Sequence, residues 1–265
     1  MEPKNLEYDF FSFLIFVNFL FSGINRKPAV LKYRTNEKLC LRMPGYKVKM
    51  GFGLHFGWAI EGAIGSEFKI DASYLSPNVN MASRLEAATK QYGVPLLISN
   101  ELHNILSKKT QRVCREIDRV TVKGSKKPIG LYTVDTDLSQ MERALDKGYT
   151  KAELKAKHKE KKQLIKENTV SNANNAELIK ANGFFDTDKD LLLLCHQALG
   201  PFRNTFSDAF EQYIRGDWTF AKETLENGLK EREDDGPSQT LLSVMKEFGG
   251  RAPDDWKGFR VLTDK

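Results

Sequence analysis

The chain has 265 residues, with 41 Lys and Arg against 35 Asp and Glu and a formal net charge of +6. This length suits one medium domain with an appendage, or two small domains. A hydrophobic content of 40%, with only 19 Gly and 9 Pro, excludes a fibrous or fully disordered polymer. The three cysteines, Cys40, Cys114 and Cys195, include no CxxC pair. They exclude a disulfide framework and a zinc knuckle, and they favour a reducing, cytoplasmic compartment.

The most apolar stretch is the Phe-rich segment at 10–21, within an N-terminal segment at 1–26. As a helix it would be roughly 18 Å long, which is too short for a hydrocarbon core of about 30 Å. The acidic residues Glu2, Glu7 and Asp9 argue against a signal peptide. Three alternatives stay open for this segment: a buried core element, contact with a membrane or an interface, and a wrongly assigned chain start.

Strand and helix patterns interleave between 46 and 134, which predicts an α/β or α+β class. We expect a half-buried strand at 46–53, and a strand, a glycine-assisted bend and a return strand within 54–65. A helix at 79–91 follows Pro77. The later elements are a buried strand at 96–99, a short helix at 100–106, and a strand pair at 113–122 and 129–134.

The last half of the chain divides into a linker and a helical region. Residues 137–182 are basic and Asn-rich, and they include six Lys at 151–162 without interleaved aromatic residues, so no nucleic-acid binding is expected. We expect residues 183–265 to form a small helical C-terminal extension that docks on a protein partner. It should end in an ordered cap at 253–259. Its two apolar stripes are Phe202, Phe206, Phe210 and Tyr213, and, after a break at Gly216 and Asp217, Trp218, Ala221, Leu225 and Leu229.

Several motifs follow one another in the order of a known family. They are Gly53-Leu54-His55 with Gly57; Gly62 with Gly65; Val79-Asn80-Met81-Ala82-Ser83-Arg84-Leu85-Glu86; Leu97-Ile98-Ser99; and Val122-Lys123-Gly124. Residues 47–136 thereby resemble the class III nucleotidyl cyclases, the adenylyl and guanylyl cyclases. The resemblance implies an α+β sandwich with a ferredoxin-like core, N-terminally incomplete, at 27–136, followed by a small all-α region.

Asn80 and Arg84 are four residues apart on one helix, so they share a face. An amide can bond a ribose oxygen, and a guanidinium matches phosphate oxygens in charge and geometry. By resemblance these two are the catalytic residues, which orient the ribose and stabilise the pentavalent phosphorus. The structural alternatives are that Asn80 caps its helix and that Arg84 pairs with Glu61 or Glu86.

The resemblance also implies a nucleotide-binding set. Lys123 matches the triphosphate-binding lysine, with Lys126 as a stand-in. Ser73 falls at the purine-binding position, which favours adenine over guanine, and Asp71 is the second candidate. A plain turn residue is the structural alternative for Ser73. His55 is expected to be a packed or hydrogen-bonded structural histidine, and His103, His158 and His196 have no spacing typical of a metal site.

The family binds Mg²⁺ or Mn²⁺ through two Asp residues upstream of the Gly-Leu-His strand, and this chain has neither motif. Asp9 lies in Tyr-Asp-Phe-Phe, without the glycine of the family pattern. We therefore expect no metal ligand from this chain. The resemblance implies a homo- or heterodimer with a cyclase domain, and a complementary partner that bears both Asp residues would supply the carboxylates.

The predicted function is conversion of ATP, or less favourably GTP, to cyclic nucleotide and pyrophosphate in cyclic-nucleotide signalling. The alternative is a non-catalytic cyclase-homology subunit of a larger assembly. In either case we expect a cytoplasmic protein, alone or associated with a membrane or an assembly.

Overall fold

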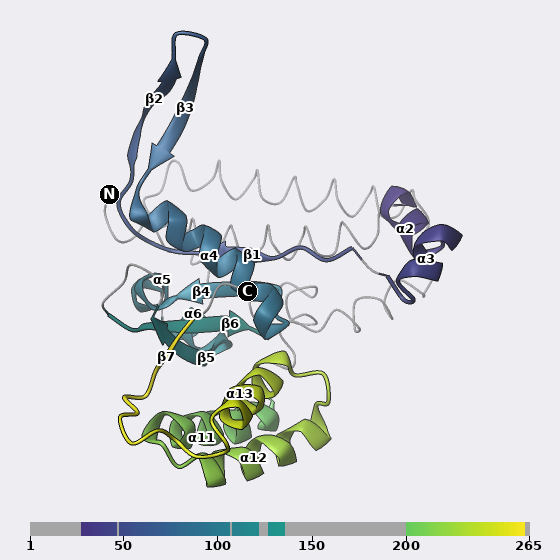
Figure 1. Cartoon of the computed structure of the whole chain (residues 1–265), viewed down its shortest axis with the longest axis vertical. Coiled ribbons are helices and arrows are strands. Elements are labelled where there is room, and N and C mark those ends of the chain that lie inside the picture. The colour runs from purple at the N-terminus through teal and green to yellow at the C-terminus, as the bar shows by residue number, and fades with distance from the viewer. Residues whose placement is uncertain (1–27, 47, 107, 122–126, 136–199, 263–265) are drawn as a thin grey trace, which may run out of the picture.

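The computed structural model describes residues 28–46, 48–106, 108–121, 127–135 and 200–262, and Figure 1 shows their arrangement. The predictions for the Phe-rich segment, the linker at 137–182, Lys123 and Lys126 fall outside these residues. Within the described part, no helix combines the length and the apolar composition needed to cross a lipid bilayer.

A five-stranded mixed sheet forms the centre of the described chain. Its order is β1 (Phe52–Leu54), β4 (Leu96–Ser99), β6 (Ile129–Val134), β5 (Cys114–Thr121) and β7 (Arg260–Val261). The β1–β4 and β5–β7 pairs are parallel, and the other two pairs are antiparallel. The predicted strands at 96–99, 113–122 and 129–134 are confirmed, whereas only the last part of the strand expected at 46–53 belongs to a strand.

Alternate residues of the central strands face two different cores. Leu97 and Leu131 belong to a core shared with the helix after the hairpin and with the C-terminal helices. Leu96 and Ile98 belong to a second core with Leu102 and neighbouring residues. Because successive side chains of a strand point to opposite faces, this division places helices on both faces of the sheet. It also explains why all four residues of β4 are buried.

The helix predicted at 79–91 is confirmed as α4 (Pro77–Tyr92). It begins at Ser76, whose hydroxyl accepts from the Asn78 N–H, and ends at Gly93 in the left-handed conformation. The predicted helix at 100–106 is α5 (Asn100–Ile105). Three short helices complete this part: α2 (Pro28–Arg34), α3 (Glu37–Arg42) and α6 (Lys108–Val113).

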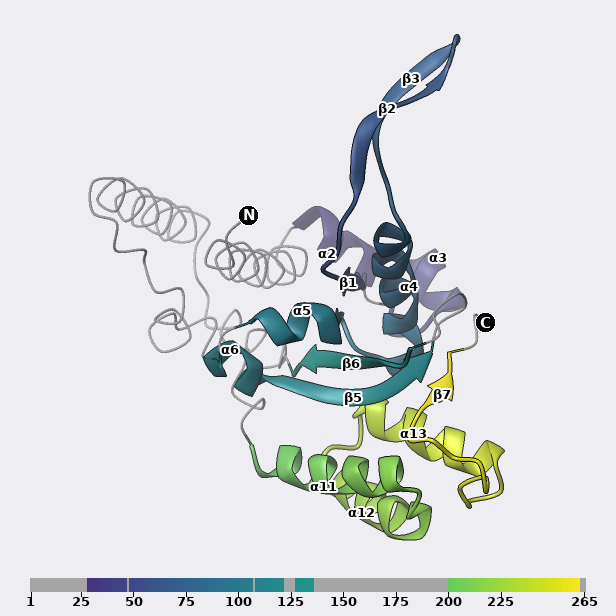
Figure 2. The same cartoon turned by 90° about the vertical axis from the view of Figure 1, so that its left-hand side faces the viewer.

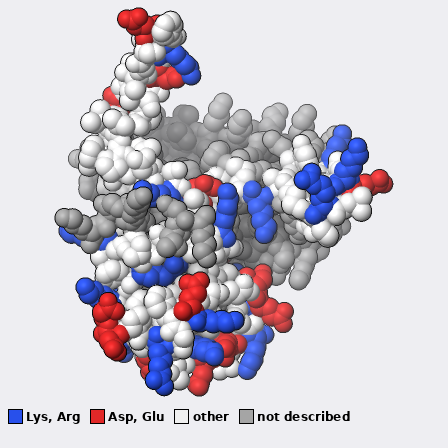
Figure 3. All heavy atoms as spheres, viewed as in Figure 1, with Lys and Arg blue, Asp and Glu red and all other residues white. Residues whose placement is uncertain are grey.

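A two-stranded hairpin stands away from the rest of the protein (Figures 1 and 2). It pairs β2 (Ile60–Ser66) with β3 (Lys69–Leu75) in antiparallel register. The expectation of a strand, a bend and a return strand within 54–65 is therefore wrong. The chain leaves the sheet after Leu54, and its return strand starts only at Lys69. Almost every hairpin side chain is exposed, and Figure 3 shows its charged side chains gathered mainly at the outer end, with a mostly uncharged surface nearer the body.

Three helices follow the linker: α11 (Pro201–Arg215), α12 (Trp218–Glu231) and α13 (Gly236–Glu247). The two predicted stripes lie on α11 and α12, while α13 was not predicted. Both stripes are mostly buried, and their side chains share one core with β5, β6 and α4. The apolar faces that suggested docking on a partner are thus covered by the chain's own sheet (Figure 2).

The architecture confirms the predicted α+β class with a C-terminal helical region. The predicted cap at 253–259 is ordered, and Trp256 packs edge-on against Trp218 and Tyr213. β7 then adds to the free side of β5, so the end of the described chain returns to the sheet.

Candidate active site

The two predicted catalytic residues lie on α4, directly after the hairpin. Asn80 is exposed and Arg84 is half-buried one turn further along the same face. The helix is capped by Ser76, so the alternative that Asn80 caps it is wrong. Ser73 lies within β3 opposite Gly62, so it is a strand residue and not a turn residue.

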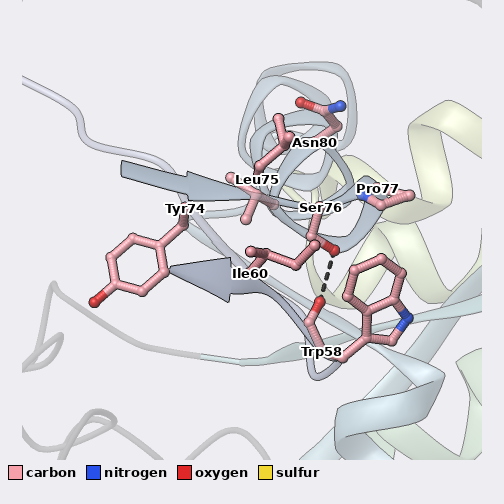
Figure 4. A pocket seen from close by; sticks show the side chains of 8 residues that line it. Trp58, Ile60, Tyr74, Leu75, Ser76, Pro77 and Asn80 are labelled. Atoms are coloured by element: carbon pink, nitrogen blue, oxygen red, sulfur yellow. Dashed lines mark hydrogen bonds between the residues drawn. The ribbon is translucent and has the colours of Figure 1, made fainter. Parts of the chain in front are cut away.

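A cavity of about 390 Å³ opens where the hairpin joins α4. Figure 4 shows the side chains around it, with the Ser76 hydroxyl donating to the Trp58 carbonyl at 2.6 Å. The lining residues are Trp58, Ile60, Tyr74, Leu75, Ser76, Pro77, Val79 and Asn80. The structure thus brings Asn80 to an apolar, partly aromatic cavity, but it does not bring Ser73, Asp71 or Arg84 to its walls.

Asp71 lies on the exposed part of β3. Its carboxylate forms an ion pair of 2.9 Å with Lys69, and both side chains are largely exposed. Exposed pairs of this kind contribute little to stability. Ser73 and Asp71 lie two residues apart, on the same face of β3. Both therefore lie on the protruding hairpin, on the strand that leads into α4.

His55 joins three elements through hydrogen bonds, which confirms the expectation of a structural role. Its Nε2 lies 3.0 Å from Oδ1 of Asn78, whose Nδ2 donates to the Trp58 carbonyl at 2.8 Å. Its Nδ1 lies 2.8 Å from the hydroxyl of Ser99 at the end of β4. With an acceptor facing Nε2, that nitrogen carries the proton and Nδ1 accepts from Ser99. The network fixes the start of α4 against β4 and the chain after β1.

The glycines of the Gly-Leu-His motif allow β1 and α4 to approach each other closely. A Cβ atom on Gly53 would lie 2.3 Å from the Ala82 carbonyl oxygen and from the Glu86 backbone nitrogen. A Cβ atom on Gly57 would lie 2.3 Å from the Asn78 side chain. The motif therefore positions the helix that carries Asn80 and Arg84, and it leaves no room for larger side chains.

No group of three or more His, Cys, Asp or Glu side chains in the described part of the chain could hold a metal ion. The donor set of these residues therefore does not fit a two-metal site. His103 instead stacks on the Tyr132 ring at 3.8 Å between centroids. Burial lowers the pKa of His103 and raises the pKa of Tyr132 to about 12.

Sequence reasoning did not identify Asn78, Trp58 and Tyr74. Asn78 completes the His55 network, and the two aromatic residues line the cavity. The position of Asn78 directly after Ser-Pro marks the first turn of a helix, where polar side chains bond neighbouring backbone groups. Nothing in the sequence links it to His55, which is 23 residues away.

The family model and the similar proteins found by comparison all point to the same family. Residues 29–136 match the sequence model of the adenylate and guanylate cyclase catalytic domain. An adenylate cyclase of Anabaena cylindrica is 37% identical over 117 residues, which are 43% of this chain and 23% of that protein. The terminal-differentiation-specific adenylate cyclase of Dictyostelium discoideum is 34% identical over 88 residues, 33% of this chain and 4% of that protein. The chain spans less than a quarter of the length of these relatives.

Two solved chains of a bacterial light-regulated adenylyl cyclase are also similar. One is 33% identical with a TM-score of 0.28, covering 32% of this chain and 23% of that chain. The other is 28% identical with a TM-score of 0.27, covering 37% of this chain and 47% of that chain. The ordered motifs on β1 and α4 and the match of the family model are together consistent with a class III adenylate and guanylate cyclase catalytic domain at residues 29–136.

Proposed function

We propose that this chain supplies the Asn and Arg half of a nucleotidyl cyclase site and that its substrate is ATP. The observation that carries the proposal is the placement of Asn80 and Arg84 on one face of α4, within the segment that matches the family. Asn80 is exposed and borders the apolar cavity, so its amide is accessible to a ligand.

In the proposed reaction the 3′-oxygen of the ribose attacks the α-phosphorus, and the bond from that phosphorus to pyrophosphate breaks. The hydroxyl proton leaves to a base or to water. The Asn80 amide bonds the ribose and holds the attacking oxygen in place, while the Arg84 guanidinium stabilises the negative charge on the phosphate oxygens. Lys123 binds the triphosphate, as its motif implies.

Three further parts of the proposal concern specificity, partner and metal. ATP is preferred because the relatives are named adenylate cyclases. By resemblance Ser73 also matches the family's purine-binding position, in the form that favours adenine. The chain works as a heterodimer with a second, complementary cyclase domain. That domain contributes the carboxylates that bind Mg²⁺ or Mn²⁺, since the described residues of this chain do not form such a cluster.

The test is to incubate the full chain with ATP or GTP and Mn²⁺, alone and together with a cyclase domain that retains both metal-binding Asp residues but whose own catalytic arginine is replaced by Ala. Cyclic nucleotide is quantified by mass spectrometry. We expect no product from the chain alone and product from the mixture, with ATP used in preference to GTP. Turnover by the purified chain alone would refute the need for a partner.

The second candidate is a non-catalytic cyclase-homology subunit of a larger assembly. The observation that favours it is the large exposed apolar surface of the hairpin, because such surfaces mark protein contacts. Its exposed side chains include Ile60, Ile64, Phe68, Ile70, Tyr74 and Leu75, and Trp58 directly before β2 is exposed as well. Absence of product from every mixture would favour this function.

A further inference from the structure

A buried cluster joins the end of α4 to the end of the described chain. The Tyr92 hydroxyl donates to Oδ2 of Asp118 on β5 at 2.6 Å. Arg260 on β7 donates from Nε to the same oxygen at 2.8 Å and from Nη2 to the Tyr92 oxygen at 2.9 Å. Tyr92 and Asp118 are both fully buried. Residues 168 positions apart in the sequence are thereby held in one hydrogen-bonded triangle.

The charges in this triangle depend on one another. Burial raises the pKa of the Asp118 carboxyl, although Arg260 and the hydrogen bonds from Tyr92 and Arg119 act in the opposite direction. Burial alone would lower the pKa of the Arg260 guanidinium, but the attraction of Asp118 raises it. Removal of the guanidinium would leave a buried carboxylate with only neutral donors, which is unfavourable.

The helix α13 also contacts the same end of α4. Gly236, the first residue of α13, lies so close that a Cβ atom there would be 2.1 Å from the Tyr92 carbonyl oxygen. One turn later, the Thr240 hydroxyl lies 3.1 Å from the Gln91 carbonyl oxygen. The C-terminal region thus contacts the last turn of α4 through both β7 and α13.

The other end of α4 is held by the His55 network, so the helix is fixed at both ends. Asn80 precedes Tyr92 by twelve residues, which is roughly 18 Å of helix at about 1.5 Å per residue. A rigid helix couples its two ends, so the contacts at its last turn help to set the direction of the helix axis and thereby the positions of Asn80 and Arg84.

We propose that the C-terminal layer, residues 200–262, is a positioning element for α4 and that Arg260 is its principal positioning residue. The layer then belongs to the nucleotide site functionally, although none of its residues lines the cavity. The catalytic consequence rests on the function proposed above. The placement of α4 by the layer does not depend on it.

The first test is amide hydrogen exchange in the full chain. In Arg260→Met we expect the amides in the last turn of α4 to exchange at least tenfold faster than in the wild type. Arg260→Lys, which keeps the charge, should restore most of the protection. Arg215→Met, which makes the same change at an exposed ion pair on α11, should leave α4 unchanged. Wild-type exchange of α4 in a folded Arg260→Met chain would overturn the proposal.

Gly236→Ala keeps the proposal testable if Arg260→Met does not fold. It forces α13 away from α4 without removing any charge, and faster exchange at Gln91 and Tyr92 is again expected. Wild-type exchange at both residues would overturn the proposal.

Activity separates positioning from a general loss of structure. In the mixture with a cyclase domain, we expect Arg260→Met to lower kcat at least tenfold with the KM for ATP within twofold, because Arg84 acts mainly in the transition state. Rescue of kcat by Arg260→Lys supports the proposal, and an unchanged kcat in a chain with loosened α4 overturns it. If the wild-type mixture makes no product, the proposed function fails, while hydrogen exchange still decides whether the layer places α4.

Discussion

Replacement of Arg115 by Met removes the central charge that joins the C-terminal helices to the sheet. Arg115 lies on β5 and is 2% exposed. Its Nη2 donates at 2.7 Å to Asp135, at the end of β6, and at 2.7 Å to Asp235, the N-cap of α13. Its guanidinium lies 4.3 Å from the centroid of the Phe206 ring on α11. Met keeps the apolar stem and loses every one of these polar contacts.

The expected cost follows from what each carboxylate retains. Asp135 keeps Arg232 at 3.3 Å, whereas Asp235 keeps only the neutral donors of Ser238. A buried ion pair that loses one partner costs about 3–5 kcal/mol. In a unit of this size each kcal/mol shifts Tm by about 2–4 °C, so Tm should fall by about 6–20 °C.

Urea denaturation followed by tryptophan fluorescence measures this cost, because Trp218 is buried in the C-terminal layer. Arg119→Met is the matched control: Arg119 is on the same strand, and its pair with Glu116 is partly exposed. It should cost less than about 1 kcal/mol. In the double variant with Asp235→Asn, the two costs should not add, since no uncompensated carboxylate remains at that position. A loss of less than about 1 kcal/mol in Arg115→Met, or full additivity, would refute the reasoning.

Three further substitutions test other parts of the structure. Gly53→Ala should destabilise the chain by about 1–3 kcal/mol, because the new methyl group meets the α4 backbone, and urea denaturation measures it. His55→Phe should cost about 1–3 kcal/mol by the same measurement, because Ser99 and Asn78 lose their buried partner. Asp235→Asn should flatten the acid limb of the stability curve. Burial would raise the pKa of Asp235, but Arg115 and Ser238 hold it below its ordinary value. Its ionised form therefore stabilises the fold above about pH 4, and this contribution is lost as pH falls through the lowered pKa.

Each of these three predictions has a control variant or a result that would contradict it. Gly62→Ala is the control for Gly53→Ala, because a Cβ atom at Gly62 meets nothing within 4 Å. Equal stability of the two variants would contradict the close approach of β1 and α4. For His55, an Asn variant that regains stability would support hydrogen bonding, while an unperturbed Phe variant would contradict it. For Asp235, acid limbs that are parallel in the wild type and the variant would show that the carboxylate has no lowered pKa.

The sequence predicted the elements whose signals are local. α4 has Pro77 at its start, an apolar stripe and Gly93 at its end, and β4 is a short apolar run between turn residues. A hairpin was predicted within 54–65, but its bounds were wrong, because the sequence criterion assumes that one face of a strand is buried. In β2 and β3 both faces are exposed. The segment around Gly62 and Ala63 therefore lacks the alternation of polar and apolar residues that predicts a strand.

The candidate site was predicted by residue type and spacing but not by its surroundings. The spacing of Asn80 and Arg84 suffices to place them on one helix face. The contacts that hold that helix and the C-terminal helices join residues far apart. Arg260 bonds Tyr92 at the end of α4, and Arg115 on β5 bonds Asp235 at the start of α13, 120 positions away. No periodicity in the sequence links such pairs. The contacts of the C-terminal layer with the sheet and with α4 could therefore not be predicted from the sequence.

The most direct test of the central claim uses a cyclase domain whose own catalytic arginine has been replaced by Ala but whose metal-binding carboxylates remain. This domain is mixed with the full chain, ATP and Mn²⁺, and cyclic AMP is quantified by mass spectrometry. The account predicts product from the mixture and none from either protein alone. Arg84→Ala in this chain should lower the product about 10²–10³-fold, and Lys90→Ala on the same helix should not. No product above the separate proteins, or product that is indifferent to Arg84→Ala, would contradict the account.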